Sequence, residues 1–274
     1  MTPVDSSEIL ADDLEQSFDG WRQRFVSFFL LPLTFTIALF VIWEAICRLF
    51  GISDFILPAP SRIFPVFVEN YSAIMINAQQ TAVTTLIGFL IGTGLGLLMG
   101  AIVGSSASVY GAVYPTLIGF NTIPKVALVP IFVVWFGYGP NIAVLTAAVT
   151  CVFPVLVVVA TAVATTEPEL DDMLRSFGAR KWDVLRKVSI PRAMPQFFGS
   201  VNLAIVSAFI GTVIAEMAAA NGGLGYLMVV ASGNLDIPLV FAGLLLLAFM
   251  GVVFYLVAAI FERRMTAWAY RGME

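Results

Sequence analysis

The 274-residue sequence contains no histidine, only two cysteines and few charged residues, which make up 12% of it. The absence of histidine removes the commonest metal ligand and the usual general base of enzymes. Cys47 and Cys151 each lie in an apolar run, and two cysteines so placed form neither a disulfide framework nor a metal motif. We therefore expect no metal centre, no bound cofactor and no catalysis by this chain.

Apolar residues are abundant instead, and they account for 59% of the sequence. Soluble domains average about 45–50% apolar and about 25% charged residues. A water-soluble fold cannot hide so much apolar surface, because even a 300-residue globule buries only about 75% of the surface that its unfolded chain exposes. The composition argues against a soluble enzyme, a nucleic-acid-binding protein and a disordered chain, and it predicts an integral membrane protein.

The negative charge is concentrated at the N-terminus. The formal net charge is −4, yet the first 20 residues hold six acids and no base, and the rest has 12 acids against 14 Lys and Arg. We expect residues 1–24 to form a solvated acidic tail. Because this tail lacks the positive n-region of a signal peptide, we expect no cleavage.

Long apolar runs indicate the fold. A helix that crosses a hydrocarbon core of about 30 Å needs about 20 apolar residues. The third run is interrupted by Pro115, Pro124 and Pro130. We predict an all-α integral membrane domain over residues 25–264, with six transmembrane helices at about 25–50, 81–104, 109–136, 141–164, 197–220 and 238–261.

Lysine and arginine indicate the side of the membrane on which each end lies, since cytoplasmic loops are enriched in them. The loop 165–195 and the two flanks of the membrane domain carry most of these residues, and the opposite loops hold little beyond Arg48 and Arg62. We therefore expect the acidic tail, the 165–195 loop and the C-terminal residues 265–274 to be cytoplasmic.

Between the first two spans, apolar residues recur at helical spacing over about 61–75. Ser61 is placed to be the N-cap of such a helix. The pattern is typical of an amphipathic helix lying on the outer membrane face. A plain connecting helix is the alternative.

Five glycines recur every four residues in the second span: Gly88, Gly92, Gly96, Gly100 and Gly104. This step places them along one ridge of a helix, where the lack of side chains lets another helix approach closely. The stretch holds no lysine and lies in an apolar run, so it is not a nucleotide-binding loop. We predict close helix packing along this ridge.

The long charged loop 165–195 separates the fourth and fifth spans. Four of its five acids precede all of its bases, an order that suits the dipole of a helix. Gly178 is a natural break between two short helices. Pro191 and Pro195 are expected to end the second helix before the fifth span begins. Apolar side chains with a polar rim suit docking in a groove of a partner protein, and anchoring at the membrane surface is the alternative.

This loop resembles the cytoplasmic signature of permease subunits of bacterial ABC importers: E-A-A, three residues, Gly, nine residues, then I-x-L-P. Here nine residues separate Gly178 from Val-Ser-Ile-Pro191, and Asp172-Met-Leu174 stands three residues before the glycine. The acid, the glycine and the proline match, whereas methionine and leucine replace the two alanines. The resemblance implies that the loop docks on an ATPase, with coupling residues Asp171, Asp172, Leu174, Phe177, Gly178, Ala179, Arg180 and Pro191.

Further segments resemble the nitrate/sulfonate/taurine branch of that family. They are LPAPS at 57–61, IPKVALVP at 123–130 with WFGYG at 135–139, and AEM at 215–217 with NGGLG at 221–225. The resemblance, over about 55–265, implies an ABC importer type I permease-like fold with a cytoplasmic coupling-helix loop. It also implies a homodimeric permease in the bacterial inner membrane, an ABC ATPase dimer that binds ATP and Mg, and an outer substrate-binding protein.

Ionisable residues inside a bilayer often mark a pathway or a buried pair. Glu44 lies near the end of the first span, where contact with lipid headgroups would explain it. Lys125 lies at a proline-interrupted break, and broken helices are tolerated where they line a cavity or are buried in protein. The alternatives are that Lys125 is the counter-ion of Glu216 and that polar side chains bond neighbouring helices. The pathway or gate candidates are Asn121, Lys125, Thr150, Asn202 and Glu216.

The glycine run after Glu216 favours a turn or a short re-entrant loop, with a role as a gate or in receptor docking.

The sequence thus predicts a non-catalytic permease subunit of an ATP-driven importer for a small solute delivered by a binding protein. Lys125 favours an anion without identifying it, and the resemblance implies an anion of the nitrate, sulfonate or taurine kind. A pyrimidine precursor, an aromatic acid or an amino acid stays open as solute. A passive channel and a membrane-embedded enzyme are the alternatives from other classes, and an enzyme would need clustered acid, base or metal residues in the spans.

Overall fold

The computed structural model describes residues 30–165, 173–174, 176–178 and 180–266. In these residues every regular element is a helix. Five of the described helices are long and apolar enough to cross a membrane, and one bent pair of helices has the length and composition of a sixth, broken span or of a re-entrant loop. The chain divides into two compact units, residues 1–65 and 66–274.

The first unit contains α2 (Leu31–Leu49) and the start of α3 (Pro60–Glu69), which continues into the second unit. A proline in the first turn of α2 loses no helical hydrogen bond there. Gly51, just after α2, has a φ of +59°, the left-handed conformation that ends many helices. Since α3 begins at Pro60, Ser61 is its second residue, and the prediction that Ser61 is the N-cap is wrong.

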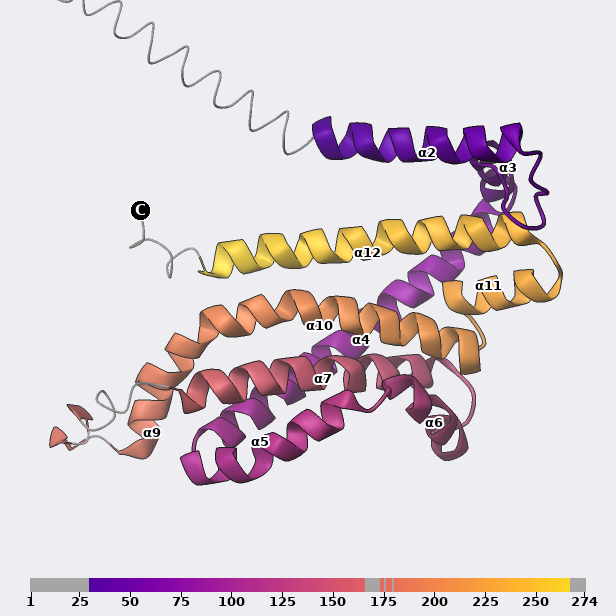
Figure 1. The fold of residues 1–274 in the computed structure, drawn as a ribbon. Coiled ribbons are helices and arrows are strands. Elements are labelled where there is room, and N and C mark those ends of the chain that lie inside the picture. Colours follow the sequence, from indigo (N-terminus) through magenta and orange to yellow (C-terminus); the bar gives the residue numbers. More distant parts are fainter. Residues whose placement is uncertain (1–29, 166–172, 175, 179, 267–274) are drawn as a thin grey trace, which may run out of the picture. The chain divides into compact units, whose positions relative to one another are not determined.

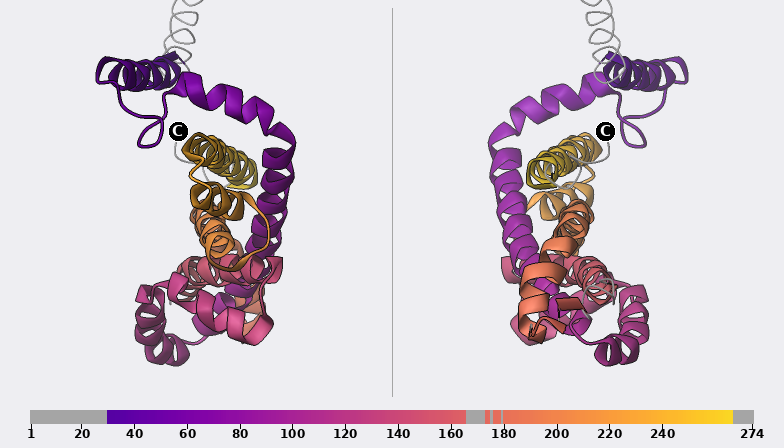
Figure 2. Two further views of the ribbon diagram at one scale, coloured as in Figure 1. Left: turned by 90° about the vertical axis from the view of Figure 1, so that its right-hand side faces the viewer. Right: turned by 90° about the vertical axis from the view of Figure 1, so that its left-hand side faces the viewer.

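The second unit is built on four long helices: α4 (Tyr71–Gly104), α7 (Pro140–Ala164), α10 (Ile190–Ala219) and α12 (Ile237–Thr266). In Figure 1, α7, α10 and α12 run side by side, and Figure 2 shows α4 along one side of them. Valines and alanines of α7 and α10 form the centre of the core, among them Val155, Val159, Val201 and Ala204.

The glycine ridge of α4 packs against α7, as predicted. A Cβ atom added at Gly88 would lie 2.5 Å from the Cβ of Ala147, one at Gly96 would lie 2.8 Å from the Cβ of Val155, and the other three ridge glycines are equally close to α7. Carbon atoms in contact normally lie about 3.5–4.0 Å apart. Each ridge position therefore has room for hydrogen only, and the two helix backbones approach along nearly the whole of α7.

The third span is broken at one proline instead of three. α5 (Ala107–Thr122) and the pair η2 (Lys125–Leu128) and α6 (Val129–Phe136) meet at a bend of 83°. Ile123 is extended, with ψ of 128°, because the residue before a proline is disfavoured in the helical region. Pro115 lies inside α5, and Pro130 lies in the first turn of α6, where its missing N–H is no loss.

Several helices begin before the predicted positions. α4 starts ten residues before residue 81, so the amphipathic stretch 61–75 is shared between α3 and α4. α9 (Lys181–Val184) and one π-helical turn, η3 (Leu185–Ser189), lead into α10. Pro191 and Pro195 lie inside α10, so the prediction that they end a helix is wrong: a proline near the start of a helix removes few helical hydrogen bonds. The short α11 (Leu224–Gly233) precedes α12.

Candidate functional site

The break in the third span brings together a cation, an amide and an aromatic ring. The Lys125 ammonium donates to the Asn121 side-chain oxygen at 3.0 Å and also to the Asn121 backbone carbonyl. It lies 5.7 Å from the centre of the Phe153 ring of α7, within the range of a cation–π interaction. Asn121 is exposed. This group, the Lys125 cluster, offers a positive charge beside an aromatic face.

Lys125 and Glu216 form no ion pair. The Glu216 carboxylate, which is 1% exposed, accepts a hydrogen bond from the Thr81 hydroxyl at 2.9 Å and one from the Gly225 N–H at 3.1 Å. The Thr84 hydroxyl lies 3.5 Å from its other oxygen. All these partners are neutral, so the interpretation of Lys125 as the counter-ion of Glu216 is wrong.

The turn predicted after Glu216 is present and leads into α11. The Gly223 N–H donates to the Asn77 side-chain oxygen, and the Leu224 N–H donates to the Thr81 hydroxyl, each at 2.8 Å. Gly223 has a φ of +98°, and a Cβ there would collide with the Glu216 carboxyl group. Asn77 and Thr81 are polar partners that the sequence analysis missed. Their spacing offers a signal, because Thr81 and Asn77 lie about two and three helical turns before Gly88, on the same ridge of α4.

Asn202 and Thr150 make different kinds of hydrogen bond: Asn202 bonds another helix, and Thr150 bonds its own. The Asn202 amide donates to the Glu262 carboxylate of α12, which confirms the alternative of bonding between helices. The Thr150 hydroxyl bonds the backbone of its own helix, to the carbonyls of Thr146 and Ala147 at 2.8 Å, so that alternative is wrong for Thr150. A pathway role for either residue stays a prediction.

The segment predicted to dock on an ATPase, here named the coupling segment, is described in part, since Asp171, Asp172 and Ala179 lie outside the described residues. Gly178 has a φ of +85° and forms the predicted break between two helical pieces. Phe177 is 82% exposed and Trp182 is 65% exposed. Leu174 is half-buried, and Arg180 and Pro191 are exposed. Two large aromatic side chains thus project on either side of a glycine that holds a left-handed conformation.

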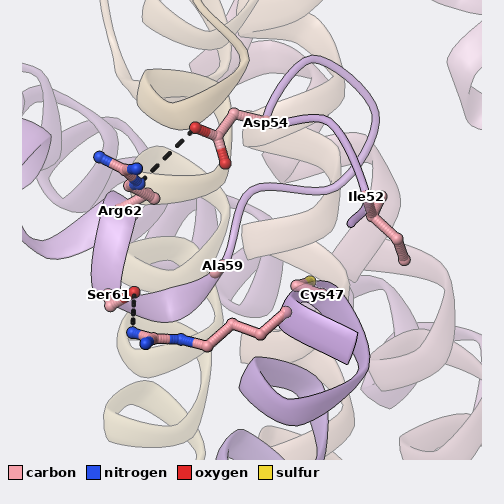
Figure 3. A pocket seen from close by; sticks show the side chains of 7 residues that line it. Cys47, Ile52, Asp54, Ala59, Ser61 and Arg62 are labelled. Carbon is pink, nitrogen blue, oxygen red and sulfur yellow. Dashed lines mark hydrogen bonds and ion pairs between the residues drawn. The ribbon is translucent and has the colours of Figure 1, made fainter. Parts of the chain in front are cut away.

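In the first unit, Glu44 holds the start of α3. Its carboxylate accepts the Ser61 N–H at 3.0 Å and the Ser61 hydroxyl at 2.7 Å, and it pairs with Arg48 at 2.6 Å. These bonds within the chain explain Glu44 without lipid headgroups. Figure 3 shows the adjoining pocket of about 470 Å³, where Arg62 pairs with Asp54 at 3.8 Å. Because each arginine has a carboxylate beside it, the pocket carries no excess positive charge.

Three carboxylates in the described helices have separate partners: Glu44 has Ser61 and Arg48, Glu216 has Thr81 and Gly225, and Glu262 has Asn202. Within the part of the chain that the structure describes, no three His, Cys, Asp or Glu residues are grouped as metal ligands. Cys47 and Cys151 are free and buried.

The chain belongs to the family "Binding-protein-dependent transport system inner membrane component", which it matches over residues 92–267. It is 38% identical to the riboflavin transport system permease protein RibX of Chloroflexus aurantiacus, over 87% of this chain and 89% of that protein. It is 30% identical to the formylaminopyrimidine transport permease protein ThiX of Halalkalibacterium halodurans, over 86% of this chain and 95% of that protein. It is 28% identical to the putative aliphatic sulfonates transport permease protein SsuC of Bacillus subtilis, over 92% of this chain and 90% of that protein.

The fold is that of a solved ABC importer. An inward-facing structure of the MetNI methionine ABC transporter matches with a TM-score of 0.61 at 19% identity, over 70% of this chain and 96% of that one. A second crystal form matches with a TM-score of 0.57 at 20% identity, over 74% of this chain and 98% of that one. The resemblance to ABC importer permeases and the all-α membrane fold are therefore confirmed. The chain is a multi-pass inner-membrane permease.

Proposed function

We propose that this chain forms the solute pathway of an ATP-driven importer, as two identical copies joined to a cytoplasmic ATPase dimer and served by an outer binding protein. The observation that carries the proposal is the projection of Phe177 and Trp182 beside Gly178, in the loop that matches the ATPase-coupling signature. ATP and Mg are bound by the ATPase subunits and not by this chain. The ATPase must bind one conformer of the permease better than the other, because a partner with equal affinity for both conformers leaves their populations unchanged.

The coupling segment gives the first test. Changing Gly178 to leucine is expected to reduce the ATPase that co-purifies with the permease by about tenfold or more, because a side chain at φ +85° strains the backbone by about 1–3 kcal/mol and displaces the aromatic side chains. Phe177→Ala should act in the same direction without straining the backbone. The amount of ATPase retained on a tagged permease is the measurement.

Gly137→Leu is the matched control, since Gly137 has a φ of +74°, has open space around it and lies at the opposite end of α7. It should retain the ATPase. Equal losses for Gly178→Leu and Gly137→Leu, with full retention in Phe177→Ala, would mean that the segment does not dock. ATP hydrolysis by the purified permease alone would contradict the proposal as a whole.

The proposed orientation has both termini and the 165–195 loop in the cytoplasm. We expect Arg180→Cys to react with a membrane-impermeant maleimide only after cells are permeabilised. Tyr138→Cys, at an exposed turn near the opposite end of α7, should react in intact cells. The native Cys47 and Cys151 are buried and should contribute little labelling. Labelling of Arg180→Cys in intact cells would show that the 165–195 loop faces the outside and would contradict the proposed orientation.

For the solute, the relatives and the Lys125 cluster together support a small planar heteroaromatic compound. The two relatives at 38% and 30% identity carry names for riboflavin and formylaminopyrimidine transport, and the sulfonate relative is 28% identical. A ring stacked on Phe153 would place an acceptor or an anionic group beside Lys125. Uptake of labelled riboflavin, formylaminopyrimidine and taurine by proteoliposomes holding the assembled transporter separates this proposal from the sulfonate alternative. Flux without ATP would indicate a passive channel.

A further inference from the structure

The N-terminus of α11 is capped entirely by side chains of other helices. Three successive backbone N–H groups, those of residues 223, 224 and 225, donate to Asn77, Thr81 and Glu216 in turn. The first N–H groups of any helix have no partner within it. Here two partners come from α4 and one from α10. We call these three residues the cap cluster.

α11 has no cap of its own, because the residue at its N-cap position is Gly223, which has no side chain. The cap cluster also explains how Glu216 is buried without a cation. The N-terminus of a helix carries a partial positive charge, and the Glu216 carboxylate lies against the first turn of α11. The carboxylate and the helix start therefore stabilise each other, and side chains of both α4 and α10 hold the first turn of α11.

The two helices that share the cap cluster run in opposite directions. Early residues of α4 contact late residues of α10 at the cap cluster, and Leu97 and Ala101 of α4 line an apolar cavity of about 220 Å³ with Ala193 of α10 near their other ends. The 30 residues of α10 span about 45 Å. At its start, α10 follows η3 and α9 without interruption, and so it joins the coupling segment to the cap cluster.

One turn inward from the cap cluster, two buried hydroxyl groups have no hydrogen-bond partner. They belong to Thr85 of α4, four residues after Thr81, and to Thr212 of α10, four residues before Glu216. Buried polar groups are almost always paired, and an unpaired one calls for an explanation. Both side chains are fully buried, and they lie on the two helices that share the cap cluster.

We propose that Glu216 is a positioning residue that holds the start of α11 on α10 and next to Thr81 of α4, and that a shift of α10 against α4 during transport draws α11 away from α4. The proposal rests on the proposed function, since it takes the shift of α10 to follow from ATPase action on the coupling segment. Asn77 and Thr81 stay with α4 in this movement, whereas Glu216 travels with α10. The cap cluster then links the ATPase side of the permease to its opposite end.

The first test measures exposure of the turn in the assembled transporter. Ala220, which is buried in the turn, is changed to cysteine after both native cysteines have been replaced by alanine. We expect an impermeant maleimide to react with this cysteine about tenfold faster when Glu216→Ala is added, because at least one hydrogen bond of a charged group is lost. Glu216→Gln keeps an acceptor oxygen for the Gly225 N–H and should restore slow labelling.

Glu262→Ala is the matched control, since it removes a carboxylate that bonds α10 to α12 instead of α11. Its labelling should equal that of the reference protein. Equal labelling of the Glu216→Ala, Glu216→Gln and reference proteins would overturn the proposal. Equally fast labelling of Glu216→Ala and Glu216→Gln, at unchanged thermal stability, would do the same.

The second test locks the turn on α4. A Cβ at Gly222 would lie 3.0 Å from the Cδ atom of Gln80, so Gln80→Cys with Gly222→Cys should form a disulfide on oxidation. We expect ATP hydrolysis by the cross-linked transporter to fall about tenfold and to recover on reduction, since a docked α11 cannot follow α10. Full hydrolysis in the cross-linked protein, or failure of the disulfide to form, would overturn the proposal. Absence of riboflavin, formylaminopyrimidine and taurine uptake by the reduced protein would instead count against the proposed function, and the labelling test would still decide on the cap cluster.

Discussion

Changing Gly96 to leucine is expected to prevent purification of a stable permease. A Cβ at this position would lie 2.8 Å from the Cβ of Val155 and 2.8 Å from the backbone oxygen of Val152, and leucine adds three more carbon atoms. Neither the backbone of α7 nor a β-branched side chain can move aside cheaply, and overpacking of this kind costs about 1–3 kcal/mol or more. We expect aggregation on size-exclusion chromatography in detergent, or a melting temperature lowered by about 5–10 °C.

Gly94→Leu provides the matched control on the same helix. Gly94 is exposed, has an ordinary backbone conformation and has no neighbouring atom within 4 Å of an added Cβ. It should give protein as stable as the parent, since only the side chain facing away from α7 changes. A Gly96→Leu protein with unchanged melting temperature and elution would show that α4 and α7 are not in close contact.

Changing Lys125 to methionine is expected to lower solute uptake by about tenfold or more while the ATPase still co-purifies. Methionine keeps an unbranched apolar side chain over Phe153 but removes the ammonium group and its bonds to Asn121. A hydrogen bond to a charged group contributes about 1.5–3 kcal/mol, which corresponds to a change of about tenfold to a hundredfold in affinity. Uptake of labelled solute by proteoliposomes with ATP, compared with ATPase retention, is the measurement.

Two controls separate charge from geometry in this prediction. Lys125→Arg keeps the charge and should retain part of the uptake, with a shift in apparent affinity, because a guanidinium group is planar and longer. Arg62→Met removes a positive charge that is paired with Asp54 in the first unit and should leave uptake unchanged. Normal uptake by Lys125→Met would remove Lys125 from the pathway.

Features that recur at a regular spacing in the sequence were predicted correctly. The glycine step from Gly88 to Gly104 indicated one packed face, and α7 lies against all five positions because only hydrogen atoms fit there. The break at Gly178 and the turn after Glu216 were also anticipated, since glycine adopts the left-handed conformation without strain. These inferences hold because they depend on a single helix or turn.

Proline positions were less informative than expected. Pro115, Pro124 and Pro130 look alike in the sequence, yet only Pro124 follows a residue that left the helical region. Pro191 and Pro195 were expected to end a helix and instead lie near the start of α10. Pro115 lies inside α5 and Pro154 lies in the middle of α7 without ending either helix. Membrane helices tolerate an internal proline because neighbouring groups can satisfy the freed carbonyl, and those neighbours are set by the tertiary structure.

The sequence by itself determined that this chain is an all-helical membrane protein, because its apolar content is too high to be buried in water. It also located the segment that resembles the coupling signature of ABC importer permeases. Only the tertiary structure decided the partners of the buried polar groups. Glu216 bonds Thr81, which is 135 residues away, and Gly223 bonds Asn77, which is 146 residues away. A buried carboxylate must find donors wherever the fold brings them, and the sequence around Glu216 does not show that the start of α11 and the first turns of α4 supply them.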